Sequence, residues 1–212
     1  MADVTVDADA IRAQIEQAAR KAGRDPAGVT LLAATKYLDT EDVGKLIEAG
    51  VTVLGENRAQ ALEEKAARYP DATWHFIGQL QSRKVKTILP LVTLIHSVAS
   101  ESALNQLATH GTPETEILIQ VDVAGEDSKA GIALEDLERY LEQATVTVVG
   151  LATMPPAVED PEANRPVFRR LRELADEHGL HHCSMGTSQD FAVAVEEGAT
   201  IVRVGSALLH RS

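Results

Sequence analysis

The stretch Leu31-Leu32-Ala33-Ala34-Thr35-Lys36 is an apolar run that ends in a lysine. Its first residues are typical of a buried β-strand, and strand interiors seldom need a lysine. At the carboxyl end of a strand in an α/β barrel, however, polar side chains often carry the chemistry of the protein. An amine held against an apolar core is disfavoured as ammonium, which makes it nucleophilic enough to form a Schiff base. The alternative is a surface lysine that closes the strand and reaches solvent.

Strand-like and helix-like segments alternate on both sides of this stretch. A helix is predicted over residues 8–22, and the first strand over 29–35. Seven more strands are predicted at residues 51–54, 73–77, 92–96, 116–123, 146–152, 181–185 and 200–204. The helices between them are predicted at 40–49, 57–68, 82–88, 101–109, 134–143, 161–178 and 188–197. This alternation predicts the α/β class and a closed (β/α)8 TIM barrel.

The predicted barrel occupies the whole chain. No proline- or glycine-rich linker interrupts the 212 residues, so 1–212 is expected to be a single domain. Little sequence follows the last strand to form an outer helix, and the opening helix is expected to cover that part of the barrel wall. An open sheet of seven or nine strands is the structural alternative.

Charge and cysteine content exclude several classes of function. Lysine and arginine number 20 against 32 acidic residues, a net charge of -12, which disfavours nucleic acid and anionic membrane as partners. The single cysteine, Cys183, cannot form an internal disulfide or a thiolate zinc cluster. No signal-peptide pattern and no apolar run of membrane-spanning length is present. A soluble cytoplasmic protein is therefore expected.

Small and hydroxyl-bearing residues follow the last two predicted strands. Backbone N–H groups at glycine turns and helix N-termini bind phosphate without net positive charge, and these loops are the usual phosphate site of such barrels. A helix beginning at about Ser188 would add to this site. Taken singly, the glycines are also explained as turn residues and the serines as caps. The predicted phosphate site consists of Ser184, Gly186, Thr187, Ser188, Gly205 and Ser206.

Arg203 lies inside the last predicted strand, where an arginine is costly without a partner because its guanidinium never deprotonates. It could pair with a buried acid such as Glu56, or it could face a ligand. A reactive lysine, a phosphate site and an arginine between them together describe a site for pyridoxal 5′-phosphate. The aldehyde would meet Lys36, and the ring would lie between the lysine and the phosphate loops.

The motifs of the chain resemble those of the pyridoxal phosphate homeostasis (YggS/PROSC) family, which is related to the N-terminal barrel of alanine racemase. The resemblance runs from about Leu31 to Leu208. It rests on Ala34-Thr35-Lys36, Gly55-Glu56-Asn57-Arg58, Trp74-His75-Phe76-Ile77-Gly78, His96-Ser97-Val98, Glu126 with Lys129 and Gly131, Ser184-Met185-Gly186, and Val202-Arg203-Val204-Gly205. The chain departs from the family pattern at Arg83, Ala152, Thr187 and His210.

This resemblance implies a cofactor and a role for three residues. Lys36 would hold pyridoxal phosphate as an internal aldimine, Asn57 would lie beside the cofactor, and Arg203 would face the pyridine nitrogen. It also implies storage and supply of the cofactor, with enzymes that use it as possible recipients. Lys129 could accept the aldehyde during such a transfer, although a solvated loop lysine is the simpler interpretation.

The same residues argue against turnover. Arg203 can only donate hydrogen bonds, so it would keep the ring nitrogen unprotonated and weaken the electron sink that carbanion chemistry needs. Alanine racemase adds a second base from a separate β domain, which is not expected in this chain, so no catalytic residue is predicted and a monomer is expected. Tyr37 is interpreted as a packing residue and His75 as a core histidine rather than as bases, and His96 could approach the mouth. A racemase-like enzyme is the first alternative, and a barrel isomerase or aldolase acting on a sugar phosphate is the second.

A metal site is not predicted. His181-His182-Cys183 contains three residue types that bind metals, but neighbouring residues of a strand point to opposite faces. The three side chains therefore cannot converge on one tetrahedral ion.

Overall fold

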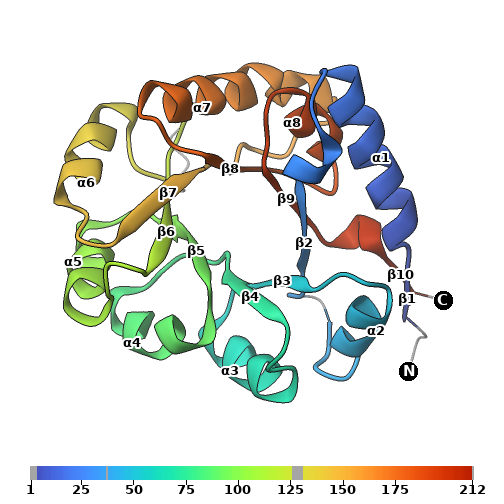
Figure 1. Ribbon diagram of the computed structural model, residues 1–212, viewed down its shortest axis with the longest axis horizontal. Coiled ribbons are helices and arrows are strands. Elements are labelled where there is room, and N and C mark those ends of the chain that lie inside the picture. The colour runs from blue at the N-terminus through green and yellow to red at the C-terminus, as the bar shows by residue number, and fades with distance from the viewer. Residues whose placement is uncertain (1–3, 37, 126–130, 212) are drawn as a thin grey trace.

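The computed structural model of the protein describes residues 4–36, 38–125 and 131–211. Eight parallel strands close into a barrel in the order β2 to β9, with β9 beside β2 (Figure 1). They are β2 (Thr30–Ala34), β3 (Val53–Glu56), β4 (Thr73–Phe76), β5 (Leu94–Val98), β6 (Glu116–Gln120), β7 (Thr147–Ala152), β8 (His182–Thr187) and β9 (Ile201–Val204). The closed order confirms the predicted TIM barrel and excludes the open sheet.

Helices surround the barrel as an outer ring (Figure 1). They are α1 (Ala8–Lys21), α2 (Val43–Glu48), α3 (Ala59–Arg68), α4 (Val85–Ile88), α5 (Glu101–His110), α6 (Leu137–Gln143), α7 (Arg165–Glu177) and α8 (Phe191–Glu196). Short 3₁₀ turns are η1 (Pro26–Gly28), η2 (Ser82–Lys84), η3 (Leu89–Leu91), η4 (Leu134–Asp136), η5 (Pro161–Asn164) and η6 (Ser206–Leu208). Three of them, η2, η4 and η5, lead directly into the helix that follows. Among the described residues, the longest and most apolar helices fall short of what a membrane crossing requires.

The opening helix α1 fills the gap in the outer ring. It buries Ile11 and Ile15 on one face, and Lys21 at its end pairs with Glu196 of α8 at 2.7 Å. After β9, the described chain continues with η6 and the short strand β10 (Leu209–Arg211). This strand pairs antiparallel with β1 (Val4–Val6) at the foot of α1 (Figure 1). The expectation that α1 covers this part of the wall is confirmed.

Apolar packing forms two layers, one between strands and helices and one inside the barrel. The inner layer is small and consists of Leu32, Leu94, Leu118, Ala152 and Ile201. Because alternate strand residues face the same side, the residues two positions after Leu94 and Ile201 also face the interior, nearer the carboxyl end. Those residues are polar, namely His96 and Arg203, so the barrel interior changes from apolar to polar toward its carboxyl end.

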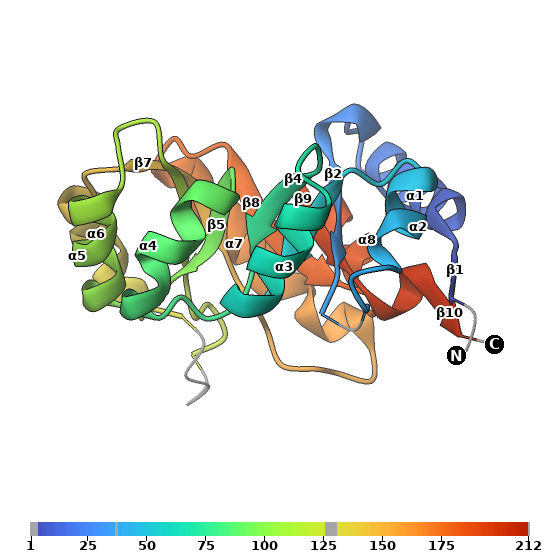
Figure 2. The same ribbon diagram turned by 90° about the horizontal axis from the view of Figure 1, so that it is seen from below.

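The carboxyl ends of the strands share one side of the molecule. Viewed as in Figure 2, the segment that leads from β7 to α7 runs along the lower edge, where it crosses this side. Because polar residues reach the barrel interior at its carboxyl end, the site is to be sought at the carboxyl mouth.

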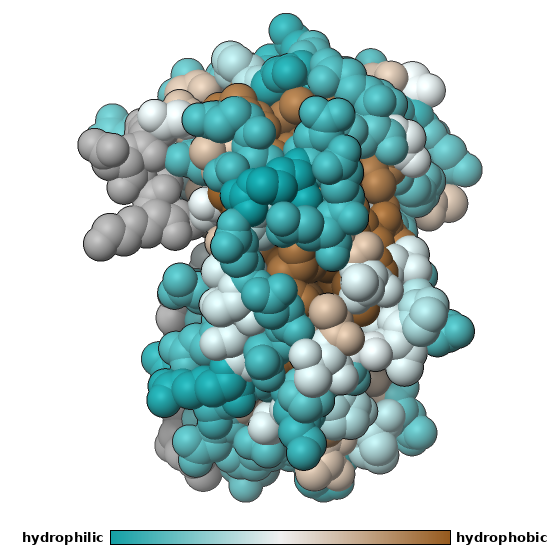
Figure 3. All heavy atoms as spheres, turned by 90° about the vertical axis from the view of Figure 1, so that its left-hand side faces the viewer, coloured by the Kyte–Doolittle hydropathy of each residue, from teal (hydrophilic) through white to brown (hydrophobic). Residues whose placement is uncertain are grey.

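The outer face over α5 and α6 is mainly hydrophilic, with apolar side chains visible in the hollow between the helices (Figure 3).

Truncation of the apolar face of α1 tests its role in closing the wall. Ile15 is 5% exposed, so Ile15→Ala is expected to lower the free energy of unfolding by about 2–4 kcal/mol, the usual cost of such a cavity. Gln17→Ala, on the exposed side of the same helix, serves as the control and should change it by less than about 0.5 kcal/mol. Urea unfolding followed by circular dichroism measures both. Equal stabilities would show that α1 is not part of the core.

Candidate functional site

Lys36 lies just beyond the carboxyl end of β2, in a turn at the barrel mouth. Its side chain is exposed, which differs from the expectation that the amine is held against the apolar core. The reason is that β2 ends at Ala34 and burial ends at Thr35, so the next residue already belongs to the loop. The lysine therefore lies at the mouth of the barrel, on the side where the carboxyl ends of the strands meet.

The two glycine-containing loops lie side by side next to this lysine. Ser188 Oγ accepts hydrogen bonds from Gly205 N at 3.0 Å and from Ala207 N at 3.2 Å, which ties the loop after β8 to the loop after β9. Since β9 pairs with β2, Gly205 approaches Ala34, two residues before Lys36. The fold thus brings together the two segments from which the phosphate site was predicted. Because Ser188 Oγ accepts both of these hydrogen bonds, its own hydroxyl proton points away from the N–H groups of Gly205 and Ala207.

The close approach of β8 to α8 requires glycine at position 186, the residue before the end of β8. Its φ is +87°, in the left-handed region, and a Cβ there would approach Ala194 Cβ at 2.6 Å and Phe191 Cα at 2.9 Å. Only glycine lets the strand end pass this close to α8. Gly186 is therefore explained by its backbone conformation and packing.

The helix predicted to begin at Ser188 begins instead at Phe191. Residues 187–190 form a turn in which Asp190 Oδ1 accepts from Thr187 N at 2.7 Å and from Thr187 Oγ1 at 3.1 Å. Asp190 is itself buried and also accepts from Asn164 Nδ2 at 2.8 Å. The prediction that the helix starts at Ser188 is therefore wrong. The backbone N and the hydroxyl of Thr187 are both hydrogen-bonded to Asp190. Ser206, at the end of the other loop, is exposed.

Arg203 is buried at the centre of the polar end of the barrel. Its Nη1 donates to Ser184 O at 2.9 Å and to Ser184 Oγ at 2.6 Å, and its Nη2 donates to Thr153 O at 2.8 Å. Its Nε is buried without a hydrogen-bond partner. Burial lowers the pKa of Arg203 to about 10, which still leaves it protonated at neutral pH. The alternative pairing with Glu56 is wrong, because Glu56 is paired with Lys65 instead.

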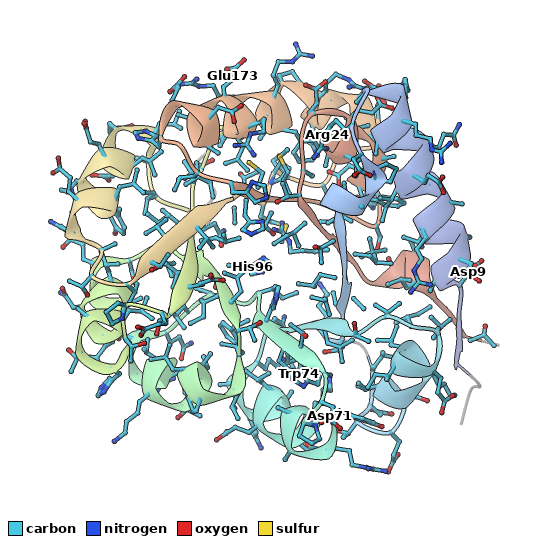
Figure 4. All side chains as sticks on the ribbon, in the orientation of Figure 1. Asp9, Arg24, Asp71, Trp74, His96 and Glu173 are labelled. Atoms are coloured by element: carbon cyan, nitrogen blue, oxygen red, sulfur yellow. The ribbon has the colours of Figure 1, made fainter. Side chains whose placement is uncertain are left out.

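A chain of hydrogen bonds continues from Arg203 across the barrel. Ser184 Oγ lies 2.8 Å from His96 Nδ1, and His96 Nε2 lies 2.9 Å from His75 Nδ1. His96 points from β5 into the middle of the barrel (Figure 4). Both histidines are buried, as predicted for His75. Ser184 therefore lies behind Arg203 rather than in the open loop.

Burial keeps both histidines neutral. Desolvation lowers the pKa of His75 to about 4 and that of His96 well below its ordinary value. A guanidinium can only donate, so Ser184 Oγ accepts from Arg203, and either its own proton or its second lone pair meets His96 Nδ1. Each neutral ring carries one proton, on one of its two nitrogens. The tautomer of His96 therefore sets which nitrogen of His75 carries the proton.

Asn57 follows β3 and leaves its side-chain oxygen unsatisfied. Its backbone N donates to Glu56 Oε1 at 2.7 Å, whereas its Oδ1 is buried without a partner. Gly78, after β4, passes so close that a Cβ would meet the Asn57 carbonyl oxygen at 2.1 Å. Among the described residues, only Asn57 Oδ1, Arg203 Nε and Arg172 Nε are buried side-chain atoms without a partner. Two of these three belong to predicted site residues, one an acceptor and one a donor.

Several sequence predictions concern other places. Tyr37, Glu126 and Lys129 lie outside the described residues. His210 belongs to β10, where its backbone pairs with Thr5. Cys183 is buried, and burial raises its pKa to about 12. No group of three or more potential metal ligands comes together within the described ranges.

Lys65 is a buried residue that was not predicted from the sequence; it is 4% exposed and donates to Glu56 Oε2 at 2.6 Å. A signal was available in the sequence. Lys65 lies three residues after Leu62 and one before Ala66, on the face of α3 that packs against the barrel. A lysine at such a position requires a buried partner.

Comparisons with known proteins agree with this geometry. The model of the alanine racemase N-terminal domain family matches residues 6–211. The pyridoxal phosphate homeostasis protein of Aquifex aeolicus is 42% identical over 210 residues, covering 92% of both proteins. The protein of the same name from Pseudomonas aeruginosa is 38% identical, covering 93% of this chain and 91% of that protein. This chain belongs to the pyridoxal phosphate homeostasis protein family.

Two solved structures have a barrel similar to that of this chain. PipY of Synechococcus elongatus, with pyridoxal phosphate bound, is 30% identical, with a TM-score of 0.76, covering 92% of this chain and 99% of PipY. Alanine racemase from Corynebacterium glutamicum is 18% identical, with a TM-score of 0.69, covering 98% of this chain and 62% of the racemase. At that identity the racemase shows the fold alone. The homeostasis family therefore shares the barrel of alanine racemase.

The neutral histidines make the stability of this family member depend on pH. Between pH 4 and 6.5 the unfolded state binds a proton that folded His75 does not, so stability falls as the pH is lowered through this range. From pH 7 to pH 5, His75 alone is expected to account for a loss of about 2 kcal/mol. Urea unfolding at the two pH values measures this loss.

A matched variant assigns the pH effect to its residue. His75→Asn keeps a polar side chain that can bond to His96 Nε2 but does not titrate in this range, so it should remove most of the contribution of His75. His178→Gln, an exposed position on the outside of the barrel, controls for the loss of an imidazole. An unchanged pH dependence in His75→Asn would contradict the buried neutral pair.

Proposed function

We propose that this protein binds pyridoxal 5′-phosphate through a Schiff base on Lys36 and stores and supplies the cofactor, with residues 1–212 acting as one cofactor-binding domain. The observation that carries the proposal is the pair of unsatisfied buried atoms, Arg203 Nε and Asn57 Oδ1, beside the joined loops and Lys36. The names of its relatives and the cofactor in PipY support the same assignment.

The residues present fit the cofactor group by group. Arg203 Nε is a donor without an acceptor, and the pyridine nitrogen supplies an acceptor. Asn57 Oδ1 is an acceptor that can take a donor from the ring substituents or from the lysine nitrogen. The end of β8 and the segments after β8 and β9 bring Gly186, Thr187, Ser188, Gly205 and Ser206 together as the proposed phosphate site. Thr187 and Gly205 already donate their N–H groups to Asp190 and Ser188 and shape the site, so the phosphate is proposed to be held by the N–H groups and hydroxyls of Ser188 and Ser206. Ser184, predicted with this set, is proposed to act by holding Arg203 in place.

A local phosphate site resolves the conflict between an acidic protein and an anionic ligand. The net charge of -12 repels phosphate at long range. Oriented backbone N–H groups act only over a few ångströms, where the long-range charge is screened by salt. Binding therefore depends on the two loops being held together, which Ser188 does through its two backbone contacts.

Storage follows from the chemistry of the attachment. When bound, the cofactor supplies an aldehyde that condenses with a neutral amine, with one water molecule released. The exposed position of Lys36 lets water or another amine reverse this condensation. The protein thus holds the cofactor covalently and gives it up without any reagent beyond water or the amine of a recipient. Enzymes that use the cofactor are the proposed recipients, and a cytoplasmic monomer is the proposed form.

The geometry favours a carrier over a racemase. Arg203 can only donate to the ring nitrogen, so the nitrogen stays unprotonated and stabilises a carbanion poorly. His75 and His96 cannot serve as bases for an amino acid at the mouth, because each is buried and bonded within the chain of hydrogen bonds behind Arg203. What these residues do is hold the guanidinium still.

Absorbance of the purified protein with pyridoxal phosphate tests the attachment. The wild type is expected to show a visible Schiff base band that borohydride abolishes, leaving a reduced adduct on Lys36 in the peptide mass map. Lys36→Ala should lack the band, and Lys86→Ala, an exposed lysine of α4, should keep it. A wild type that stays colourless would overturn the proposal and favour the sugar phosphate barrel.

Exchange of the α-proton of alanine in deuterated water separates carrier from enzyme. The loaded protein is expected to exchange this proton no faster than free pyridoxal phosphate, because Arg203 weakens the electron sink. Proton NMR of the alanine methyl and α signals measures the rate. Exchange well above that of the free cofactor, lost in Lys36→Ala, would instead establish the racemase-like alternative.

A further inference from the structure

A buried ion pair lies behind the two residues that flank the proposed site. Lys65 of α3 and Glu56 at the end of β3 are joined by a contact of 2.6 Å between Nζ and Oε2, and their side chains are 5% and 1% exposed. Helix α3 lies on the outside of the barrel next to β3 and β4 (Figure 1). The pair therefore links the outer ring of helices to the ends of the strands.

Four donors surround the carboxylate, and one of them, the Thr35 hydroxyl, also lies 3.1 Å from the carbonyl oxygen of Gly55. Oε2 accepts from Lys65 Nζ and also from Thr35 Oγ1 at 2.9 Å, while Oε1 accepts from Asn57 N at 2.7 Å and from Arg58 N at 3.3 Å. Lys65 Nζ donates in addition to the carbonyl oxygen of Thr35 at 2.8 Å. Four donors thus meet two oxygens, which is the full capacity that a carboxylate offers in this arrangement.

Stability alone does not account for this pair. Removing two charges from water is costly, and well-packed apolar side chains of similar size often stabilise a protein as well or better. What an apolar pair cannot do is fix the positions of the backbone groups that the ions hold. Those groups belong to Thr35 and Asn57, the residue before Lys36 and the residue with the unsatisfied Oδ1.

We propose that Glu56 and Lys65 are positioning residues that set the distance between Lys36 and Asn57 for the cofactor. The Thr35 carbonyl is one peptide bond from Lys36, so Lys65 fixes the start of the loop that carries the reactive amine. Glu56 holds the backbone of Asn57 through the adjacent N–H. The inference rests on the proposed function and adds two residues that lie behind the site and do not touch the ligand.

The decisive variant replaces both ions by apolar side chains, Glu56→Leu with Lys65→Met. No buried charge is then left unpaired, so the barrel is expected to fold. The backbone of Asn57 and the carbonyl of Thr35 lose their anchors, and pyridoxal phosphate should bind about tenfold more weakly, the equivalent of one well-made hydrogen bond. Titration of the visible band measures the Kd, and thermal unfolding of the protein without cofactor measures the Tm.

A second, milder variant keeps the test informative if the double variant does not fold. Glu56→Gln has the same shape but only one acceptor oxygen, so its NH₂ must face either the Lys65 ammonium or the backbone of Asn57. It is expected to weaken cofactor binding and to slow formation of the Schiff base. Leu62→Ala is the matched control, because Leu62 is fully buried on the same helix and none of the hydrogen bonds of Glu56 or Lys65 involves it. It should lower the Tm while leaving the Kd within about twofold of the wild type.

The outcomes separate the two proposals. A wild type that does not bind pyridoxal phosphate overturns the proposed function and this inference together. A wild type that binds, with variants of Glu56 and Lys65 that bind equally well, overturns the positioning role alone. Weakening by Leu62→Ala as large as that by Glu56→Gln would also overturn it, because general loosening of α3 would then explain the effect. Weaker binding in the variants, with the control unchanged, supports it.

Discussion

The guanidinium of Arg203 is the constraint around which the interior of the barrel is arranged. A buried group that can never accept a hydrogen bond must be surrounded by acceptors, and the carbonyl oxygens of Thr153 and Ser184 meet two of its nitrogens. Ser184, His96 and His75 then continue a row of hydrogen bonds across the interior. The remaining donor, Nε, has no hydrogen-bond partner, so the network ends there and this N–H can donate to an acceptor of a ligand.

Closure of the barrel is what turns scattered motifs into one site. The first and last strands of the sheet are adjacent, so the loop after β9 lies against the end of β2 although some 170 positions separate them in the chain. The loop after β8 is then fastened to its neighbour by a single serine hydroxyl, Ser188. An open sheet of the same elements would place the first and last strands at opposite edges.

The sequence pattern predicted the architecture well because strand and helix periodicity are local properties. All eight barrel strands and the covering role of α1 were expected, and Arg203 was identified as a costly buried cation. The pairing of Glu56 with Lys65 was not predicted, because the choice between Arg203 and Lys65 depends on how α3 packs on the barrel. Likewise, the start of α8 at Phe191 and the exposure of Lys36 depend on one turn and one strand end. Residue patterns constrain such boundaries only loosely.

The buried pair of Glu56 and Lys65 also constrains how this protein can evolve. Losing either ion alone leaves the other as an uncompensated charge in the interior, which is strongly destabilising. If the two residues change one at a time, the protein passes through an intermediate that is less stable than both the original and the final protein. The two positions are epistatic, and they are expected to be inherited as a unit or exchanged together over the history of the family.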